Sequence, residues 1–258
     1  MRLWLLFMLC LLPTLGMAAM LEERVKHTHE GVTFESVLIY DNTNTAARPA
    51  ILMVPNWMGV TAQSLAQAKQ VAGKEYVILV ADVYGETVRP KNPEEAKQAA
   101  TFLRSNRPLL RARANNALDA LLSAGLKAGA DPKRTAAIGF CFGGGAVLEL
   151  ARSGRNIAGV VSFHGNLDTP NPGDAANIKG AVLVLHGAND PAVPGADVLA
   201  FEAEMRAQPQ LDWQLVSFGG AVHSFTDPDA NTPGRAQYHE KSAKRAFALM
   251  HQLFKEIF

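Results

Sequence analysis

Short runs of consecutive apolar residues alternate along the chain with segments of helical periodicity, and this alternation restricts the fold more than any other feature. A run that is apolar at every position is typical of a strand buried on both faces of a parallel sheet. Strands that alternate with helices form a mainly parallel central sheet with helices on both of its faces. We therefore predict a single α/β domain over residues 20–258. Its predicted strands cover residues 33–40, 50–54, 77–83, 135–140, 157–163, 181–186 and 213–218, and its predicted helices cover residues 61–74, 93–105, 109–126, 144–152, 196–207 and 237–258.

The charges of the chain nearly cancel, with 25 Lys and Arg against 24 Asp and Glu. Arg2 carries the only charge among the first 20 residues, so without that segment the balance is 24 minus 24, or zero. A chain without net charge generates no field that attracts nucleic acid or an anionic membrane. We therefore expect no nucleic-acid partner. Independently of the charge, we expect a small-molecule partner and a monomeric protein.

Residues 1–19 have the pattern of a secretory signal peptide, with Arg2 before an apolar run at 3–12 and small residues around Ala18. That apolar run is short, because a membrane-spanning helix needs about 20 apolar residues. We therefore expect cleavage near Ala18 or Ala19, a secreted or periplasmic protein and no stable membrane span. Cleavage there removes Cys10 and leaves Cys141 as the only thiol, so the mature chain would have no internal disulfide.

Cys141 lies in a glycine-rich segment, Gly139-Phe140-Cys141-Phe142-Gly143-Gly144-Gly145, which directly follows a predicted strand and precedes a predicted helix. This is the pattern of a nucleophile elbow with Cys in place of Ser. Glycines are needed there because the tight turn strains the backbone and brings neighbouring segments close together. The helix N-terminus favours a thiolate, which is the reactive form of cysteine. We therefore predict that Cys141 is a catalytic nucleophile; the alternative is an inert buried cysteine beside packing glycines.

An elbow nucleophile needs a base and a residue that orients the base, and these follow in the chain order nucleophile, acid, histidine. Asp190 lies in a turn after the predicted strand at 181–186, and His223 follows the strand at 213–218. Both therefore belong at the same edge of the sheet as Cys141. We expect His223 to act as the base and Asp190 to fix its tautomer. We expect His186 to order the loop that carries Asp190.

An oxyanion hole takes the N–H group of the residue after the nucleophile and one from the loop after an early strand. The sequence predicts Phe142 and Trp57 in these places. Side chains near these positions form a predicted, largely apolar substrate pocket. No Cys or acidic cluster completes a metal site around His27 and His29, so we expect no metal and no cofactor. The predicted pocket residues are Asn56, Met58, Tyr84, His164 and Phe225.

Three motifs together resemble the dienelactone hydrolase family of α/β-hydrolases: Gly139-Phe140-Cys141-Phe142-Gly143-Gly144, His186-Gly187-Ala188-Asn189-Asp190-Pro191 and His223-Ser224-Phe225. A weaker fourth motif is Ala81-Asp82-Val83-Tyr84-Gly85. The resemblance covers nearly the whole chain after residue 19. It implies a carboxylic-ester hydrolase that cleaves small esters or lactones through a thioester acyl-enzyme, using a Cys-His-Asp triad and no cofactor.

Two positions depart from the family pattern. Family members carry a glutamate before the oxyanion-loop residue, where this chain has Asn56, and an arginine four residues after the catalytic histidine, where it has Asp227. The arginine of those enzymes holds a substrate carboxylate, which Asp227 would repel. The sequence also allows two other functional hypotheses: a non-catalytic small-molecule binding protein on the same scaffold, and a thiol-based redox protein.

Overall fold

The computed structural model describes residues 20–258, and its centre is an eight-stranded sheet with the strand order β1-β2-β4-β3-β5-β6-β7-β8. The strands β1 (Met20–His29) and β2 (Val32–Asp41) form an antiparallel hairpin, and β2 also pairs antiparallel with β4 (Val77–Val80). All pairs from β4 to β8 are parallel, which confirms the predicted sheet. The expected signal peptide lies outside the described residues. The other strands are β3 (Arg48–Val54), β5 (Ala130–Phe140), β6 (Gly159–Phe163), β7 (Ala181–Gly187) and β8 (Trp213–Phe218).

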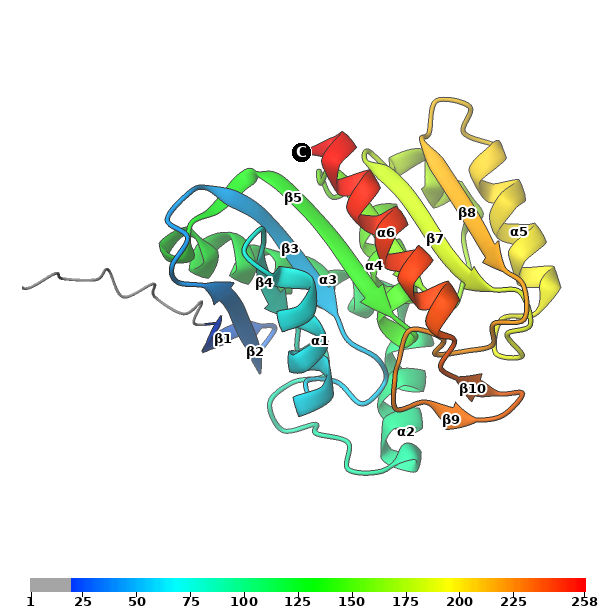
Figure 1. Ribbon diagram of the computed structural model, residues 1–258, viewed down its shortest axis with the longest axis horizontal. Helices are drawn as coiled ribbons and strands as arrows, with labels where there is room; N and C mark the ends of the chain where they lie inside the picture. The colour runs from blue at the N-terminus through cyan, green and yellow to red at the C-terminus, as the bar shows by residue number, and fades with distance from the viewer. Residues whose placement is uncertain (1–19) are drawn as a thin grey trace, which may run out of the picture.

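Helices cover both faces of this sheet, as predicted (Figure 1). The helices α1 (Ala62–Ala72) and α6 (Glu240–Ile257) pack over one buried apolar cluster. The second cluster, on the opposite face, is covered by α2 (Pro93–Arg104), α3 (Arg107–Ala124), α4 (Phe142–Arg152) and α5 (Gly195–Arg206). The remaining elements are the 3-10 helices η1 (Gly125–Ala128) and η2 (Pro172–Asn177) and the two-stranded ribbon of β9 (Asn231–Thr232) and β10 (Ala236–Gln237).

Several predicted boundaries differ from the structure, and two of the differences have clear local reasons. The strand predicted at 77–83 ends at Val80, because the Asp82 carboxylate accepts the N–H groups of Tyr84 and Gly85, each at 3.0 Å, and turns the chain. The helix predicted to start at residue 237 starts at 240, because the preceding residues pair in β10 and His239 caps the helix. The predicted start of α2 is confirmed, with Asn92 as its N-cap.

Buried ion pairs tie α4 to α5 at the end of α4 that lies away from Cys141. The Arg152 guanidinium contacts Glu149 at 3.0 Å and Glu204 at 2.7 Å, and all three side chains are almost fully buried. Removing one partner from such a group leaves an uncompensated buried charge. The pairs therefore fix the helix whose first turn follows Cys141.

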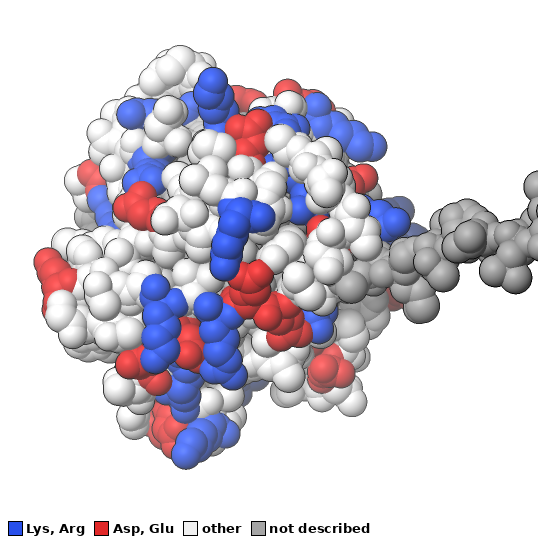
Figure 2. Space-filling view, turned by 90° about the vertical axis from the view of Figure 1, so that its left-hand side faces the viewer, with Lys and Arg blue, Asp and Glu red and all other residues white. Residues whose placement is uncertain are grey.

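Charges of both signs are interspersed on the face of the molecule that carries the β1–β2 hairpin (Figure 2). Lys26 pairs with Glu86 at 2.9 Å and Lys127 with Glu23 at 2.6 Å. Within residues 20–258, none of the helices combines the length and apolar character needed to cross a bilayer.

Candidate active site

Cys141 lies in a sharp turn between β5 and α4, with φ of 55° and ψ of −120°. A residue other than glycine at positive φ is strained, at a cost of about 1–3 kcal/mol. The glycines around it permit this turn: a Cβ on Gly139 would lie 2.0 Å from the carbonyl oxygen of Gly143. A Cβ on Gly143 would lie 2.0 Å from the carbonyl oxygen of Val54. The strand, turn and helix are therefore arranged as the sequence predicts.

The structure brings Cys141, His223 and Asp190 into one hydrogen-bonded row. The Nε2 atom of His223 lies 3.1 Å from the Sγ atom of Cys141, and its Nδ1 atom lies 2.8 Å from the Oδ2 atom of Asp190. The Asp190 side chain is fully buried, and the side chain of His223 is 16% exposed. A carboxylate on Nδ1 leaves the Nε2 atom of the imidazole facing the sulfur, which is the geometry for proton transfer.

The two central groups of this row shift each other toward an ion pair. Burial raises the pKa of Cys141, but the hydrogen bond and charge of His223, together with two backbone N–H groups, outweigh burial, so the pKa of the thiol is lowered. Burial lowers the pKa of His223, but the hydrogen bonds and charges of Asp190 and Cys141 together outweigh burial, so the pKa of the imidazole is raised. The two shifts therefore favour a thiolate beside an imidazolium.

Two backbone N–H groups point at the same sulfur, and they are the two that the sequence indicates. The N–H groups of Phe142 and Trp57 both donate toward the Cys141 thiol and lower its pKa. Phe142 is the first residue of α4, and Trp57 lies in the loop after β3. Donors fixed in this way could stabilise negative charge on an oxygen that forms next to the sulfur.

The loop that carries Trp57 is held by side chains on both sides of it. The Asn56 Oδ1 atom accepts the N–H of Met58 at 2.9 Å, which makes an Asx turn. The Tyr84 hydroxyl donates to the carbonyl oxygen of Trp57 at 2.9 Å, and its ring packs 5.5 Å from that of Phe142. Tyr84 is 5% exposed, so it supports this loop from inside the protein.

Asp82 fixes Tyr84 and accounts for the Ala81–Gly85 motif, a role that the sequence analysis missed. Its carboxylate accepts the N–H groups of Tyr84 and Gly85 and pairs with Arg89 at 2.9 Å. The Asp82 side chain is 1% exposed, so this pair is shielded from water on the carboxylate side. The Arg89 guanidinium is therefore paired with a carboxylate of the protein itself.

His186 does not have the role that we expected. Within residues 20–258, its Nδ1 atom is buried without a hydrogen-bond partner. The loop around Asp190 is ordered by hydrogen bonds within the loop itself. The N–H of Ala192 donates to Asp190 Oδ1 at 2.8 Å, and the N–H of Asp190 donates to the carbonyl oxygen of Gly187 at 2.9 Å.

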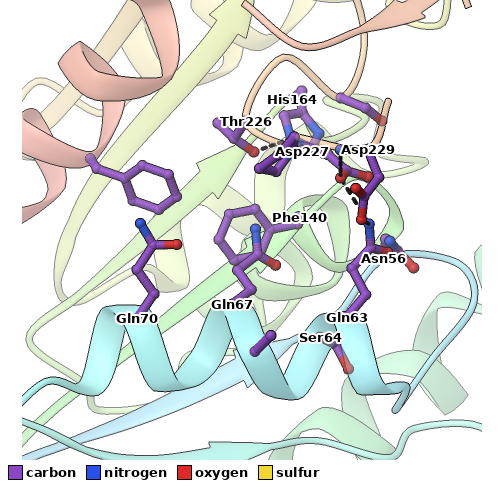
Figure 3. A pocket seen from close by; sticks show the side chains of 14 residues that line it. Asn56, Gln63, Ser64, Gln67, Gln70, Phe140, His164, Thr226, Asp227 and Asp229 are labelled. Carbon is purple, nitrogen blue, oxygen red and sulfur yellow. Dashed lines mark hydrogen bonds between the residues drawn. The ribbon is translucent and has the colours of Figure 1, made fainter. Parts of the chain in front are cut away.

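A cavity of about 210 Å³ lies between α1 and the loop that follows His223 (Figure 3). Cys141, His223 and Asp190 do not line it, but Ser224, the residue after His223, does. Of the five predicted pocket residues, Asn56 and His164 line it. Met58, Tyr84 and Phe225 do not, and Phe225 is fully buried behind His164. The full lining is Asn56, Gln63, Ser64, Ala66, Gln67, Gln70, Phe140, His164, Ser224, Thr226, Asp227, Pro228, Asp229 and Phe247.

The cavity combines apolar side chains with three glutamines and two aspartates. Glutamine side chains rise from α1 toward the loop that carries Asp227 and Asp229 (Figure 3). The Gln63 amide donates to Asp227 at 2.8 Å and to Asp229 at 3.4 Å. Within the described part of the chain, the lining contains no Lys or Arg. Helical spacing alone did not show that these glutamines line the cavity, because that depends on how α1 packs on the sheet.

Solved proteins share this architecture. The structure of a protein named m3DLH superposes with a TM-score of 0.86 at 36% identity, covering 93% of this chain and 99% of that chain. A dienelactone hydrolase-like promiscuous phosphotriesterase from metagenomic libraries gives a TM-score of 0.85 at 33% identity, with the same coverage. An uncharacterised protein of Caenorhabditis elegans is 37% identical over 133 residues, which are 50% of this chain and 83% of that protein.

The sheet, its helices and the residues at the ends of its strands define a protein of the α/β-hydrolase class. The model of the dienelactone hydrolase family matches residues 36–258. The chain therefore belongs to the dienelactone hydrolase family, whose members are hydrolases.

Proposed function

We propose that this protein hydrolyses small carboxylic esters or lactones by covalent catalysis, with Cys141 as nucleophile, His223 as acid and base, and Asp190 as the residue that orients His223. The observation that carries the proposal is the 3.1 Å contact between the Nε2 atom of His223 and the Sγ atom of Cys141. The contact joins a thiol of lowered pKa to an imidazole of raised pKa. A nucleophile held in this way beside its base is the arrangement that acyl transfer requires.

In the first half-reaction, the Cys141 thiolate attacks the carbonyl carbon of the ester and forms a C–S bond. The carbonyl oxygen becomes an oxyanion, which the N–H groups of Trp57 and Phe142 stabilise. When the oxyanion collapses, the bond to the alcohol oxygen breaks, and the leaving oxygen takes the proton from Nε2 of His223. The products are a free alcohol and a thioester on Cys141.

In the second half-reaction, the now neutral His223 takes a proton from water, and the oxygen of that water attacks the thioester carbonyl. Collapse of the second oxyanion breaks the C–S bond and releases the acid. The thiolate forms again beside the protonated imidazole, with Asp190 on the other ring nitrogen throughout. Atoms and charge balance without a metal or an organic cofactor.

The cavity supports an uncharged or cationic substrate group next to the reacting carbonyl. Asp227 and Asp229 line it, and its other polar side chains are uncharged amides and hydroxyls and the neutral ring of His164. A substrate carboxylate placed there would meet two negative charges, so binding would be opposed by like-charge repulsion. The side chains of Phe140 and Phe247 offer an apolar surface in the same cavity.

Turnover of 4-nitrophenyl acetate by the purified protein and by Cys141→Ala tests this function. We expect the wild type to release nitrophenol with multiple turnovers and the variant to lose this activity while keeping the same unfolding midpoint. Equal turnover by the two proteins would refute the assignment of Cys141.

We also propose that the protein acts outside the cytoplasm. The support is the sequence pattern of residues 1–19, with a basic start, a short apolar run and small residues near Ala18. Expression of the full chain, followed by cell fractionation and N-terminal sequencing, tests this. Export would yield a mature chain that begins near Met20, whereas a cytoplasmic protein that retains residues 1–19 would contradict it.

A further inference from the structure

His164 directly follows the strand β6 and has a strained backbone conformation. Its φ is 40°, a region that residues other than glycine rarely occupy. Its backbone N–H donates to the carbonyl oxygen of Leu185 at 2.8 Å, and its side chain is 3% exposed. Strain of this kind persists only where surrounding contacts hold it.

The ring of His164 joins the backbone of the nucleophile to the loop that carries the base. The N–H of Cys141 donates to Nδ1 of His164 at 3.2 Å, and the same N–H reaches the carbonyl oxygen of Phe163 at 3.0 Å. The Nε2 atom lies 2.8 Å from the hydroxyl oxygen of Thr226, which is itself 3% exposed. Thr226 stands three residues after His223 (Figure 3).

These contacts fix the protonation of the ring. Because Nδ1 faces an N–H donor, it presents a lone pair, so the single proton of the neutral ring is on Nε2 and is donated to Thr226. Burial, and next to it the charge of His223, hold the pKa of His164 well below its usual range. The titratable groups around the ring are His223 and Cys141, with Asp227 and Asp229 on the same cavity.

The ring of His164 also packs directly against the ring of His223. The two imidazoles stand edge to face with centroids 5.3 Å apart, and Phe225 packs against the other side of His164 at 5.4 Å. His164 therefore contacts both partners of the pair. It accepts the backbone N–H of Cys141 on one side and packs against the ring of His223 on the other.

We propose that His164, through Thr226, is a positioning residue of this site: a neutral ring that holds the Cys141 backbone and the His223 loop at the separation that keeps Sγ and Nε2 in contact. His164 touches no reacting atom and acts through Cys141 and His223. The proposal rests on the function proposed for those two residues, and it adds a role that differs from a pocket wall.

The test compares Thr226→Val with Thr226→Ser by the pH dependence of Cys141 alkylation with iodoacetamide, from pH 4 to 10. Valine has nearly the shape of threonine but leaves the Nε2–H of His164 without an acceptor. We expect the alkylation midpoint of Thr226→Val to rise by about one pH unit, so that the rate at pH values below the midpoint falls about tenfold, the size of one buried hydrogen bond. Serine keeps the hydroxyl, and we expect it to restore the wild-type midpoint.

His164→Phe is the second variant, because it keeps an aromatic ring and removes both nitrogens. We expect it to raise the midpoint at least as much as Thr226→Val. A purely structural role would lower the thermal unfolding temperature and leave the midpoint unchanged. A wild-type midpoint in folded Thr226→Val overturns the proposal, even if His164→Phe does not fold.

Failure of this proposal can be told apart from failure of the proposed function. If the wild type hydrolyses no ester but Thr226→Val still raises the alkylation midpoint, the positioning role stands and the ester substrate is wrong. If the wild type hydrolyses esters and Thr226→Val has the wild-type midpoint, the hydrolase stands and the positioning role is wrong.

Discussion

The Nε2 atom of His223 lies 3.1 Å from the Sγ atom of Cys141, although 82 residues separate them in the chain. Cys141 directly follows β5, and His223 lies five residues after β8, so parallel strands deliver both to the same edge of the sheet. Asp190 follows β7 and reaches the other nitrogen of the ring.

The pH dependence of the thiol follows from this contact. We expect the alkylation midpoint of Cys141 with iodoacetamide to lie below about 8.5, where an ordinary thiol is half ionised, because its pKa is lowered. Hydrolysis should rise with pH through the pKa of Cys141 and fall at alkaline pH through the raised pKa of His223, which must carry the leaving-group proton. His223→Gln should move the alkylation midpoint up; an unchanged midpoint would contradict the ion pair.

Asp190→Asn should reduce kcat/KM for ester hydrolysis by roughly two to four orders of magnitude, because the amide no longer holds the required tautomer or stabilises the imidazolium. The alkylation midpoint of Cys141 should rise in the same variant, since the pKa of His223 loses its largest support. Asp212→Asn, an exposed residue just before β8, is the matched control. Equal kinetics in the two variants would remove Asp190 from the site.

Gly143→Ala should destabilise the fold, because the new Cβ would lie 2.0 Å from the carbonyl oxygen of Val54. We expect a loss of about 2–4 kcal/mol in the free energy of unfolding, measured in urea. Gly219→Ala is the control, because nothing lies within 4 Å of its Cβ. It should change the free energy of unfolding by less than about 0.5 kcal/mol. Similar unfolding curves for both variants would contradict the close approach at the elbow.

Asp227→Asn should change which substrates the protein prefers. Removing one carboxylate from the cavity should raise kcat/KM for a nitrophenyl ester that carries a free carboxylate, relative to a neutral ester of equal length. We expect a change of about fivefold, the size of a solvent-exposed charge interaction of about 1 kcal/mol. Asp119→Asn on α3, where Asp119 is 60% exposed and pairs with Arg155, should leave the ratio unchanged. If Asp227→Asn and Asp119→Asn had the same ratio of kcat/KM values, the bound substrate would not lie near Asp227.

Much of the fold could be predicted because buried parallel strands are apolar at every position. The runs 50–54 and 181–186 lie within β3 and β7. Boundaries were less predictable where a side chain turned the backbone, as Asp82 does after β4. The hairpin strand β1 lacks a continuous apolar run, since exposed residues alternate with partly buried ones along it.

The candidate site was predictable where a residue sits at a strand end next to glycine. The contact of His223 with both Cys141 and Asp190 was predicted from the elbow motif, the chain order of the three residues and their positions after strands. The hydrogen bond between His164 and Thr226 was not predicted, because it depends on a positive φ that histidine rarely adopts. The three glutamines of the cavity were also missed, since helical spacing does not show which face of α1 lines a cavity.

Intact mass of the protein after mixing with a panel of activated esters and lactones tests the central claim most directly. We predict that the wild type gains the mass of the acyl group, that the adduct decays as acid and alcohol appear, and that Cys141→Ala gains nothing. A wild type that remains unmodified throughout turnover, or that never turns over any of these substrates although its Cys141 thiol is alkylated readily, would contradict covalent catalysis through Cys141.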